Sequence, residues 1–222
     1  MPGQRLDQLE ASIVDGLNFD LLETRAALLG RYDHPIFADL PADTSIEGYI
    51  YPETYQINSQ TTVEDLLNAS FEQLSDVFTE ELQEKIAARG LDIHEAITLA
   101  SIIEKESSNV EDQPTIAQVF LKRLDEGIML GSDVTFIYAA AISGRAATPS
   151  LDSPYNTRIV GGLPPGPISN FTASALEAIA EPADSDYLYF VAGDDGITYF
   201  SNTLAEHESL TAQHCIELCK LP

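Results

Sequence analysis

The chain has 222 residues, of which 44% are hydrophobic, so it can form one sizeable packed domain or two small ones and is not disordered. Lys and Arg number 11 against 36 Asp and Glu, which gives a formal net charge of −25. Such a charge repels phosphates, which argues against binding nucleic acid through a basic surface and against docking on anionic lipid. No apolar run approaches the roughly 18–20 residues of a membrane span, and the first ten residues do not have the pattern of a signal peptide.

The N-terminal part of the chain predicts a helical region followed by a short extended segment. Residues 5–30 have helical character, and residues 31–45, which contain two prolines, interrupt it. Residues 47–57 are rich in Tyr and Ile around Pro52. This pattern predicts a strand, a turn and a second strand.

Three helices are expected in the middle of the chain. An amphipathic stripe over residues 62–86 predicts the first of them. Asp92 and Glu95 form the pattern of a capping box, which opens the second helix. Pro114 suits the first turn of the third helix, and Gly127 stops it.

The last third of the chain mixes a long loop with regular elements. Residues 142–171 contain too many Pro and Gly for regular structure, and a loop of this length in a compact domain is usually functional. Residues 173–180 predict a short helix, and residues 186–200 predict a β-hairpin. Thr203 caps a final helix that we expect to reach Cys219. The fold class is therefore α+β, a helical unit packed with a small antiparallel sheet.

Two cysteines, Cys215 and Cys219, have the spacing of one helix face. A metal pair with His207 and His214 or a strained disulfide is compatible with this spacing, but no CxxC or HExxH pattern supports a metal. We favour a buried, unpaired Cys215 in a helix whose end frays, and we expect no metal site.

Glu106 is the most informative ionisable residue. The preceding residues 93–103 place one broad apolar face on a helix, and Glu106 follows at the edge of that face, while Glu104 lies at the opposite edge and Lys105 points to solvent. Burial and the negative pole of the helix both raise the pKa of such a carboxyl, as a general acid requires. The alternative interpretation is a solvated helix end with an intrahelical ion pair.

Several segments in order carry a resemblance to a known family. They are EGYIYPETY (47–55), LASIIEKESS (99–108), VFLKRLDEGIMLGSDVTFIYA (119–139), SPYNT (153–157), GGLPPGPISN (161–170), YLYFVA (187–192) and TLAEHE (203–208). Over about residues 45–210 the chain closely resembles the MltG (YceG-like) endolytic murein transglycosylases. In that family the second Glu of the EKE triplet is catalytic, which corresponds to Glu106, and the pair Glu106-Ser107 resembles the Glu-Ser signature of other lytic transglycosylases.

The resemblance implies cleavage of the β-1,4 bond between N-acetylmuramic acid and N-acetylglucosamine in nascent peptidoglycan strands, with 1,6-anhydro ends as products. Glu106, a lysozyme-like catalytic Glu at a helix end, serves as the single general acid and base, because the acetamido group of the substrate can stabilise the developing charge. This mechanism needs no cofactor.

Further substrate-binding residues are expected around Glu106, beginning with Ser107. Ser132 and Asp133 share one loop, where Asp133 is a candidate second carboxylate or sugar ligand; the alternative is a helix N-cap. An aromatic face, an amide and a hydroxyl suited to an N-acetylated sugar come from Tyr155, Asn156 and Thr157. The alternative for these three is turn chemistry in a Pro-rich loop.

Other motif residues are expected to be structural. Tyr187, Tyr189 and Val191 are predicted to form one face of the hairpin and to belong to the core. His207 is expected to make a hydrogen bond at a helix surface. The chain departs from the family at four positions in the presumed substrate loops, namely Gly131, Val134, Arg158 and Phe171.

We expect residues 1–45 to be an N-terminal remnant and residues 46–222 to be the catalytic domain, as an extracytoplasmic portion of a longer protein whose membrane anchor lies outside this chain. The expected partners are peptidoglycan strands and the machinery of cell-wall synthesis, without nucleic acid. Two other functions remain open, a hydrolase in which Asp133 or Glu104 activates water and a non-catalytic glycan-binding or cell-wall-synthesis scaffold module.

Overall fold

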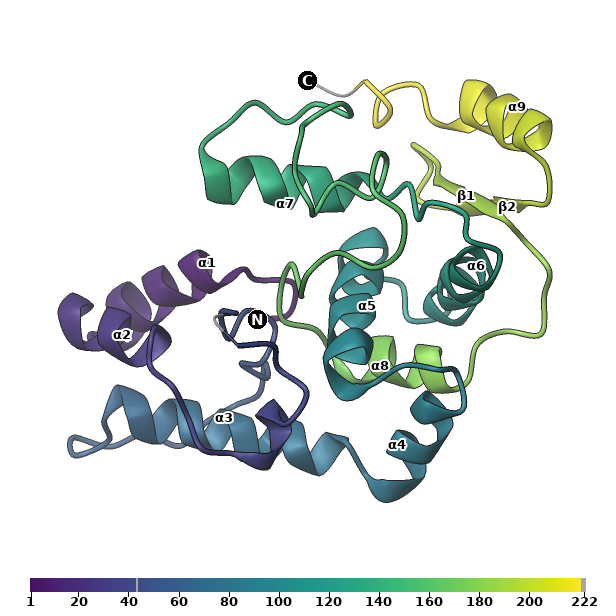
Figure 1. Cartoon of the computed structure of the whole chain (residues 1–222). Helices are drawn as coiled ribbons and strands as arrows, with labels where there is room; N and C mark the ends of the chain where they lie inside the picture. Colours follow the sequence, from purple (N-terminus) through teal and green to yellow (C-terminus); the bar gives the residue numbers. More distant parts are fainter. Residues whose placement is uncertain (43, 221–222) are drawn as a thin grey trace. The chain divides into compact units, whose positions relative to one another are not determined.

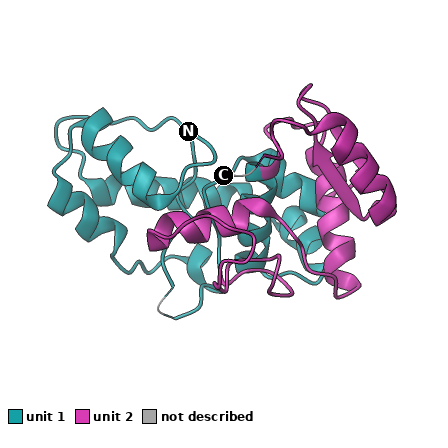
Figure 2. Ribbon diagram, turned by 90° about the horizontal axis from the view of Figure 1, so that it is seen from above, with its two compact units in different colours: residues 1–105, 166–180 teal, residues 106–165, 181–222 magenta. Residues whose placement is uncertain are grey.

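The computed structural model describes residues 1–42 and 44–220. The chain divides into two compact units, the first made of residues 1–105 and 166–180 and the second of residues 106–165 and those from 181 onward (Figure 2). The expected division at residue 45 stays a prediction. Among the described residues, no helix is both long enough and apolar enough to cross a lipid bilayer.

The first unit is helical. Its most buried helix is α5, in which every residue from 96 to 103 is buried. The α-helices of this unit, labelled in Figure 1, are α1 (Leu6–Ala11), α2 (Leu21–Leu28), α3 (Val63–Val77), α4 (Glu80–Ala87), α5 (Ile93–Glu106, of which the last residue belongs to the second unit) and α8 (Ala173–Ala180). The unit also contains a π-helical segment (Ser12–Gly16) and a 3-10 turn (Pro35–Phe37). The predicted capping box of α5 is confirmed, since Asp92 and Glu95 exchange backbone-to-carboxylate hydrogen bonds of 3.0 and 2.8 Å.

The prediction of two strands in residues 47–57 is wrong, because this segment is irregular. Its hydrogen bonds go to side chains of neighbouring helices and not to a strand ladder. The hydroxyl of the fully buried Tyr49 lies 2.9 Å from Nδ1 of His94, and the backbone N–H of Tyr51 donates to Oγ of Ser70 at 2.7 Å. The Tyr-rich composition therefore reflects anchoring in the helical core, where the same residue types are also common.

The stripe over residues 62–86 belongs to two helices, α3 and α4, and not to the single helix predicted. Thr79 separates them, because its hydroxyl accepts a hydrogen bond of 3.2 Å from the backbone N–H of Leu82 and so caps α4. The apolar stripe continues across the break, since Leu74 and Ile86 on either side are both buried.

The second unit combines helices with a hairpin. Its elements are α6 (Gln113–Asp125), α7 (Asp133–Ser143), β1 (Tyr189–Ala192), β2 (Thr198–Ser201) and α9 (Leu204–His214). The two strands pair antiparallel with Tyr189 opposite Ser201, which confirms the predicted hairpin. Helix α9 lies along the hairpin (Figure 1), and the ring of Phe120 from α6 packs edge-on against Phe190, 5.5 Å between centroids. In the described part of the chain the hairpin accounts for all strand pairing, so the predicted α+β class is confirmed.

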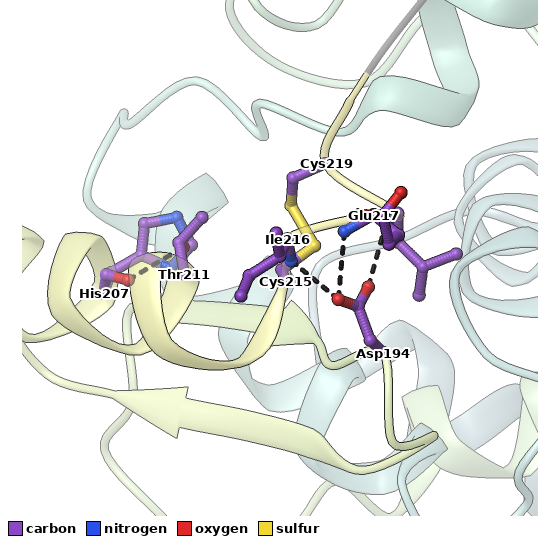
Figure 3. The surroundings of a disulfide bond; sticks show 8 residues. Asp194, His207, Thr211, Cys215, Ile216, Glu217 and Cys219 are labelled. Atoms are coloured by element: carbon purple, nitrogen blue, oxygen red, sulfur yellow. Dashed lines mark hydrogen bonds between the residues drawn. A yellow bond between two sulfur atoms is a disulfide. The ribbon is translucent and has the colours of Figure 1, made fainter.

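Helix α9 ends at His214, before the predicted end at Cys219. Cys215 and Cys219 form a disulfide, so the expectation of unpaired cysteines is wrong, although Cys215 is buried as expected. The carboxylate of Asp194, in the hairpin turn, accepts hydrogen bonds of 2.8–2.9 Å from the backbone N–H groups of residues 216–218 (Figure 3). These bonds hold the chain in a tight loop that brings the two sulfur atoms together.

Candidate active site

The second unit contains a cleft of about 590 Å³, a size suited to small ligands. Glu106, the last residue of α5, lies in its wall. The other lining residues come from α6, the 130–133 turn, the loop after α7, β1, α9 and the disulfide loop. They include Arg123, Ser132, Asp133, Arg158, Tyr189, His207, Cys215 and Cys219.

The carboxyl group of Glu106 is held in a half-buried position. Burial raises its pKa from 4.5 to about 7, although a hydrogen bond from the hydroxyl of Ser132 to Oε1 acts in the opposite direction. The negative charge of Asp133 raises the pKa further, and the positive charges of Arg158 and Arg123 lower it. The predicted upward direction is therefore confirmed, and the carboxyl can be protonated near neutral pH.

Ser132 and Asp133 lie together at the start of α7. Ser132 is the N-cap residue, and Asp133 is the first residue of the helix. The guanidinium of Arg158 forms an ion pair with the carboxylate of Asp133. The structure thus brings Ser132 and Asp133 to Glu106, as predicted, and adds Arg158, which the sequence analysis noted only as a departure from the family.

The predicted residues 155–157 do not line the cleft. Asn156 is fully buried, and its amide donates to the carbonyl groups of Pro149 and Leu151 at 3.0 and 2.9 Å. Tyr155 packs its ring against Tyr138, with centroids 4.9 Å apart. Thr157 is also buried and bonds to the backbone of Ser132. These contacts are those of the turn-forming alternative, and a role in substrate binding stays a prediction.

Ser107 follows Glu106 but does not line the cleft. Its hydroxyl accepts a hydrogen bond of 3.1 Å from the backbone N–H of Asn109, and its carbonyl accepts one of 3.1 Å from the amide of Gln113. Ser107 therefore shapes the turn between α5 and α6.

A cation and two rings form another part of the cleft wall. The guanidinium of Arg123 lies 4.9 Å from the ring centroid of Tyr189, and the ring of His207 stacks on Tyr189 at 5.4 Å. Burial lowers the pKa of His207, and the charge of Arg123 adds to this effect, so the imidazole is neutral near neutral pH.

One expectation for this wall is wrong. Tyr189 is half-buried and lines the cleft, whereas it was assigned to the core. Nδ1 of His207 is buried and has no hydrogen-bond partner among the described residues, so the expected surface hydrogen bond is not made through this atom.

Four residues of this cleft were not predicted as site residues from the sequence, namely Arg123, Arg158, Tyr189 and His207. A signal was present for three of them, because they belong to the motifs KRL, YLYFVA and TLAEHE. No group of three or more His, Cys, Asp or Glu in residues 1–42 and 44–220 is arranged to hold a metal ion.

The second unit thus presents in its cleft a protonatable Glu that ends a buried helix. The chain belongs to the YceG-like family, whose sequence profile matches residues 2–213. This match begins earlier than the motifs, which indicated about residues 45–210.

Similar proteins include the endolytic murein transglycosylase of Bacillus subtilis (strain 168), which is 39% identical over 166 residues, covering 73% of this chain and 46% of the relative. The protein of the same name from Streptococcus pneumoniae serotype 2 (strain D39) is 34% identical over 189 residues, covering 79% of this chain and 33% of the relative. The chain therefore spans about half the length of the first relative and a third of the second. A crystal structure of a yceG-like protein from Listeria monocytogenes superposes with a TM-score of 0.78 at 32% identity, covering 95% of this chain and 74% of that one.

Proposed function

We propose that this chain carries the catalytic site of an endolytic peptidoglycan lytic transglycosylase. The observation that carries the proposal is the carboxyl of Glu106, which lies in a cleft and has a pKa raised to about 7. A carboxyl of this kind is protonated often enough to donate a proton and is then basic enough to take one back. The names of the relatives support peptidoglycan as the substrate.

Glu106 acts first as an acid. It gives its proton to the glycosidic oxygen between N-acetylmuramic acid and N-acetylglucosamine as the bond from that oxygen to the anomeric carbon breaks. The acetamido oxygen of the muramic acid stabilises the positive charge on the anomeric carbon. Glu106, now a carboxylate, takes the proton of the 6-hydroxyl of the same sugar, whose oxygen bonds to the anomeric carbon. This closes the 1,6-anhydro ring, consumes no water and returns Glu106 to its protonated form.

A hydrolase with a second catalytic carboxylate is less well supported. Asp133 is the other carboxylate near Glu106 on the cleft wall, and its oxygen is engaged by the guanidinium of Arg158. That oxygen already has an ion-pair and hydrogen-bond partner, which leaves it less able to orient an attacking water molecule. The single-residue mechanism requires no such base.

The location and partners follow from the same proposal. The substrate is the nascent glycan strand, and the site acts on the extracytoplasmic face of the cell membrane, next to the machinery of cell-wall synthesis. The disulfide between Cys215 and Cys219 supports this location, since disulfides persist in oxidising compartments outside the cytoplasm. The negative net charge of the chain supports a partner other than nucleic acid.

The test is digestion of uncrosslinked peptidoglycan strands, with products identified by mass spectrometry. Wild type is compared with Glu106→Gln and with Glu104→Gln, a matched control in the same helix. The carboxylate of Glu104 accepts hydrogen bonds of 3.0 and 2.7 Å from Thr172 and does not line the cleft. We expect 1,6-anhydro ends from wild type and from Glu104→Gln, and none from Glu106→Gln.

Each other result contradicts the proposal in a distinct way. Full activity of Glu106→Gln removes Glu106 from the mechanism. Reducing ends in place of anhydro ends identify a hydrolase, and Asp133→Asn then tests the second carboxylate. Binding of strands without any cleavage identifies a glycan-binding or scaffold module.

A further inference from the structure

The hydroxyl of Ser132 departs from the usual behaviour of an N-cap serine. Such a hydroxyl normally accepts a hydrogen bond from a backbone N–H in the first turn of its own helix. Ser132 is the N-cap of α7, yet its side chain makes no capping bond. The hydroxyl donates instead to Oε1 of Glu106. Other contacts must therefore fix the position of Ser132, so that its hydroxyl points to the carboxyl of Glu106 and not to the first turn of α7.

Two buried threonines hold the backbone of Ser132 from both sides. The backbone N–H of Ser132 donates to Oγ1 of Thr157 at 3.1 Å, and the hydroxyl of Thr135 donates to the carbonyl of Ser132 at 2.7 Å. Thr135 is 0% exposed and Thr157 is 1% exposed, so no solvent competes for these bonds. Both backbone groups of the N-cap residue are thereby satisfied without its own side chain.

The two threonines are also bonded to each other. Their hydroxyl oxygens lie 3.0 Å apart, within hydrogen-bond distance. Both hydroxyls also face the carbonyl of Ser132, that of Thr135 at 2.7 Å and that of Thr157 at 3.4 Å. The backbone N–H of Thr157 donates to the hydroxyl oxygen of Thr135 at 3.2 Å. The set of bonds is closed, so the loss of one hydroxyl disturbs all of them.

We propose that Thr157 and Thr135 are positioning residues for Glu106, which act by fixing the backbone of Ser132 so that its hydroxyl stays on the carboxyl. The inference rests on the proposed role of Glu106. It reassigns Thr157, which the sequence analysis placed among the groups that touch the sugar. Without the threonines, the ordinary capping bond to the first turn of α7 competes for the Ser132 hydroxyl.

The sign of the effect follows from the groups around Glu106. The hydrogen bond from Ser132 stabilises the carboxylate, so weakening this bond raises the pKa of Glu106. The other charged groups that act on the carboxyl are Asp133, Arg158 and Arg123, and none of them changes when a threonine is replaced. Tyr189 and His207 are further titratable groups on the same cleft wall and are also unchanged.

The experiment is an NMR titration of the side-chain carboxyl carbons of Glu, in which Glu106→Gln identifies the Glu106 signal. In Thr157→Val, which keeps the shape and loses the hydroxyl, we expect the pKa of Glu106 to rise by about half a unit to one unit. Thr157→Ser restores the hydroxyl and should titrate as wild type. The matched control is Thr24→Val, since Thr24 is 0% exposed and donates its hydroxyl only within α2, at 2.8 Å to the carbonyl of Asp20.

Kinetics on glycan strands separate positioning from binding. We expect Thr157→Val to lower kcat about tenfold with KM within about twofold of wild type, because the loss falls on the proton transfer. A raised KM with an unchanged pKa of Glu106 overturns the inference and makes Thr157 a substrate-binding residue. An unchanged pKa and an unchanged kcat overturn it as well.

Two further variants keep the inference testable. Thr135→Val removes the bond to the Ser132 carbonyl and should also raise the pKa of Glu106. This variant replaces Thr157→Val in the test if Thr157→Val does not fold. Ser132→Ala removes the hydroxyl that donates to Glu106, so among these variants it should give the largest rise in the pKa of Glu106. If Glu106→Gln remains active, the proposed function fails, whereas the titrations still decide whether the threonines act on the carboxyl.

Discussion

Replacement of Glu106 by Gln should make the protein more stable at alkaline pH, in addition to removing activity. Folding raises the pKa of this carboxyl from 4.5 to about 7. Between these values the folded protein keeps a proton that the unfolded chain has released. The carboxyl therefore destabilises the folded state progressively as the pH rises through this window. Gln cannot ionise, and its side-chain oxygen can still accept the hydrogen bond from Ser132.

The rise of the pKa sets the size of the effect. At about 1.4 kcal/mol per pKa unit, the change from 4.5 to about 7 costs at most about 3.5 kcal/mol at pH 8 and less than about 1 kcal/mol at pH 5. Glu106 is only partly buried, so water screens part of this cost and we expect a gain of about 1–3 kcal/mol at pH 8. For a chain of 222 residues, each kcal/mol raises Tm by roughly 2–4 °C.

Thermal unfolding followed by circular dichroism at pH 5 and pH 8 measures this difference. We expect Glu106→Gln to melt higher than wild type at pH 8, by at least about 3 °C, and close to wild type at pH 5. Glu104→Gln is again the control and should give no gain, since its carboxylate is hydrogen-bonded by Thr172. If Glu106→Gln melts at or below the wild-type temperature at pH 8, the carboxyl is not held at a raised pKa and the reasoning fails.

Four further substitutions have expected outcomes. The charges of Asp133 and Arg158 shift the pKa of Glu106 in opposite directions. Activity at high pH should therefore be lost about half a pH unit earlier in Asp133→Asn and about half a unit later in Arg158→Gln. Measured pH–rate profiles that shift in the same direction for both variants contradict this. Cys219→Ser opens the disulfide and should cost about 2 kcal/mol by loop entropy, so an unchanged Tm in this variant argues against the bridge. Asn156→Ala should cost about 2–4 kcal/mol in chemical denaturation, because two buried carbonyl groups lose their donor, and a wild-type midpoint would contradict that role.

Signals that act over three or four residues were read correctly from the sequence. The capping boxes at Asp92 and Thr203 open α5 and α9 where predicted, because the side chain and the backbone group that it satisfies are neighbours in the chain. The hairpin of residues 189–201 was predicted for the same reason, since its turn and its alternation are local.

The errors concern segments whose structure depends on distant partners. Residues 47–57 have the composition of strands, but their hydrogen bonds go to helices α3 and α5. The cysteines have the spacing of a helix face, but Asp194 of the hairpin turn binds the backbone between them and turns the chain into a loop. The composition of a segment and the spacing of its residues carry no information about partners that lie elsewhere in the sequence.

The candidate site divides in the same way. Periodicity puts Glu106 at the end of an apolar helix face, because the spacing of residues along one helix is a local property. Only the tertiary structure brings Arg158 to Asp133 and Thr157 beneath Ser132, across 25 residues in each case. The sequence by itself thus determines where Glu106 lies on its helix, whereas the fold decides how far its carboxyl is buried and which groups tune and hold it, because those contacts join parts of the chain that no local pattern relates.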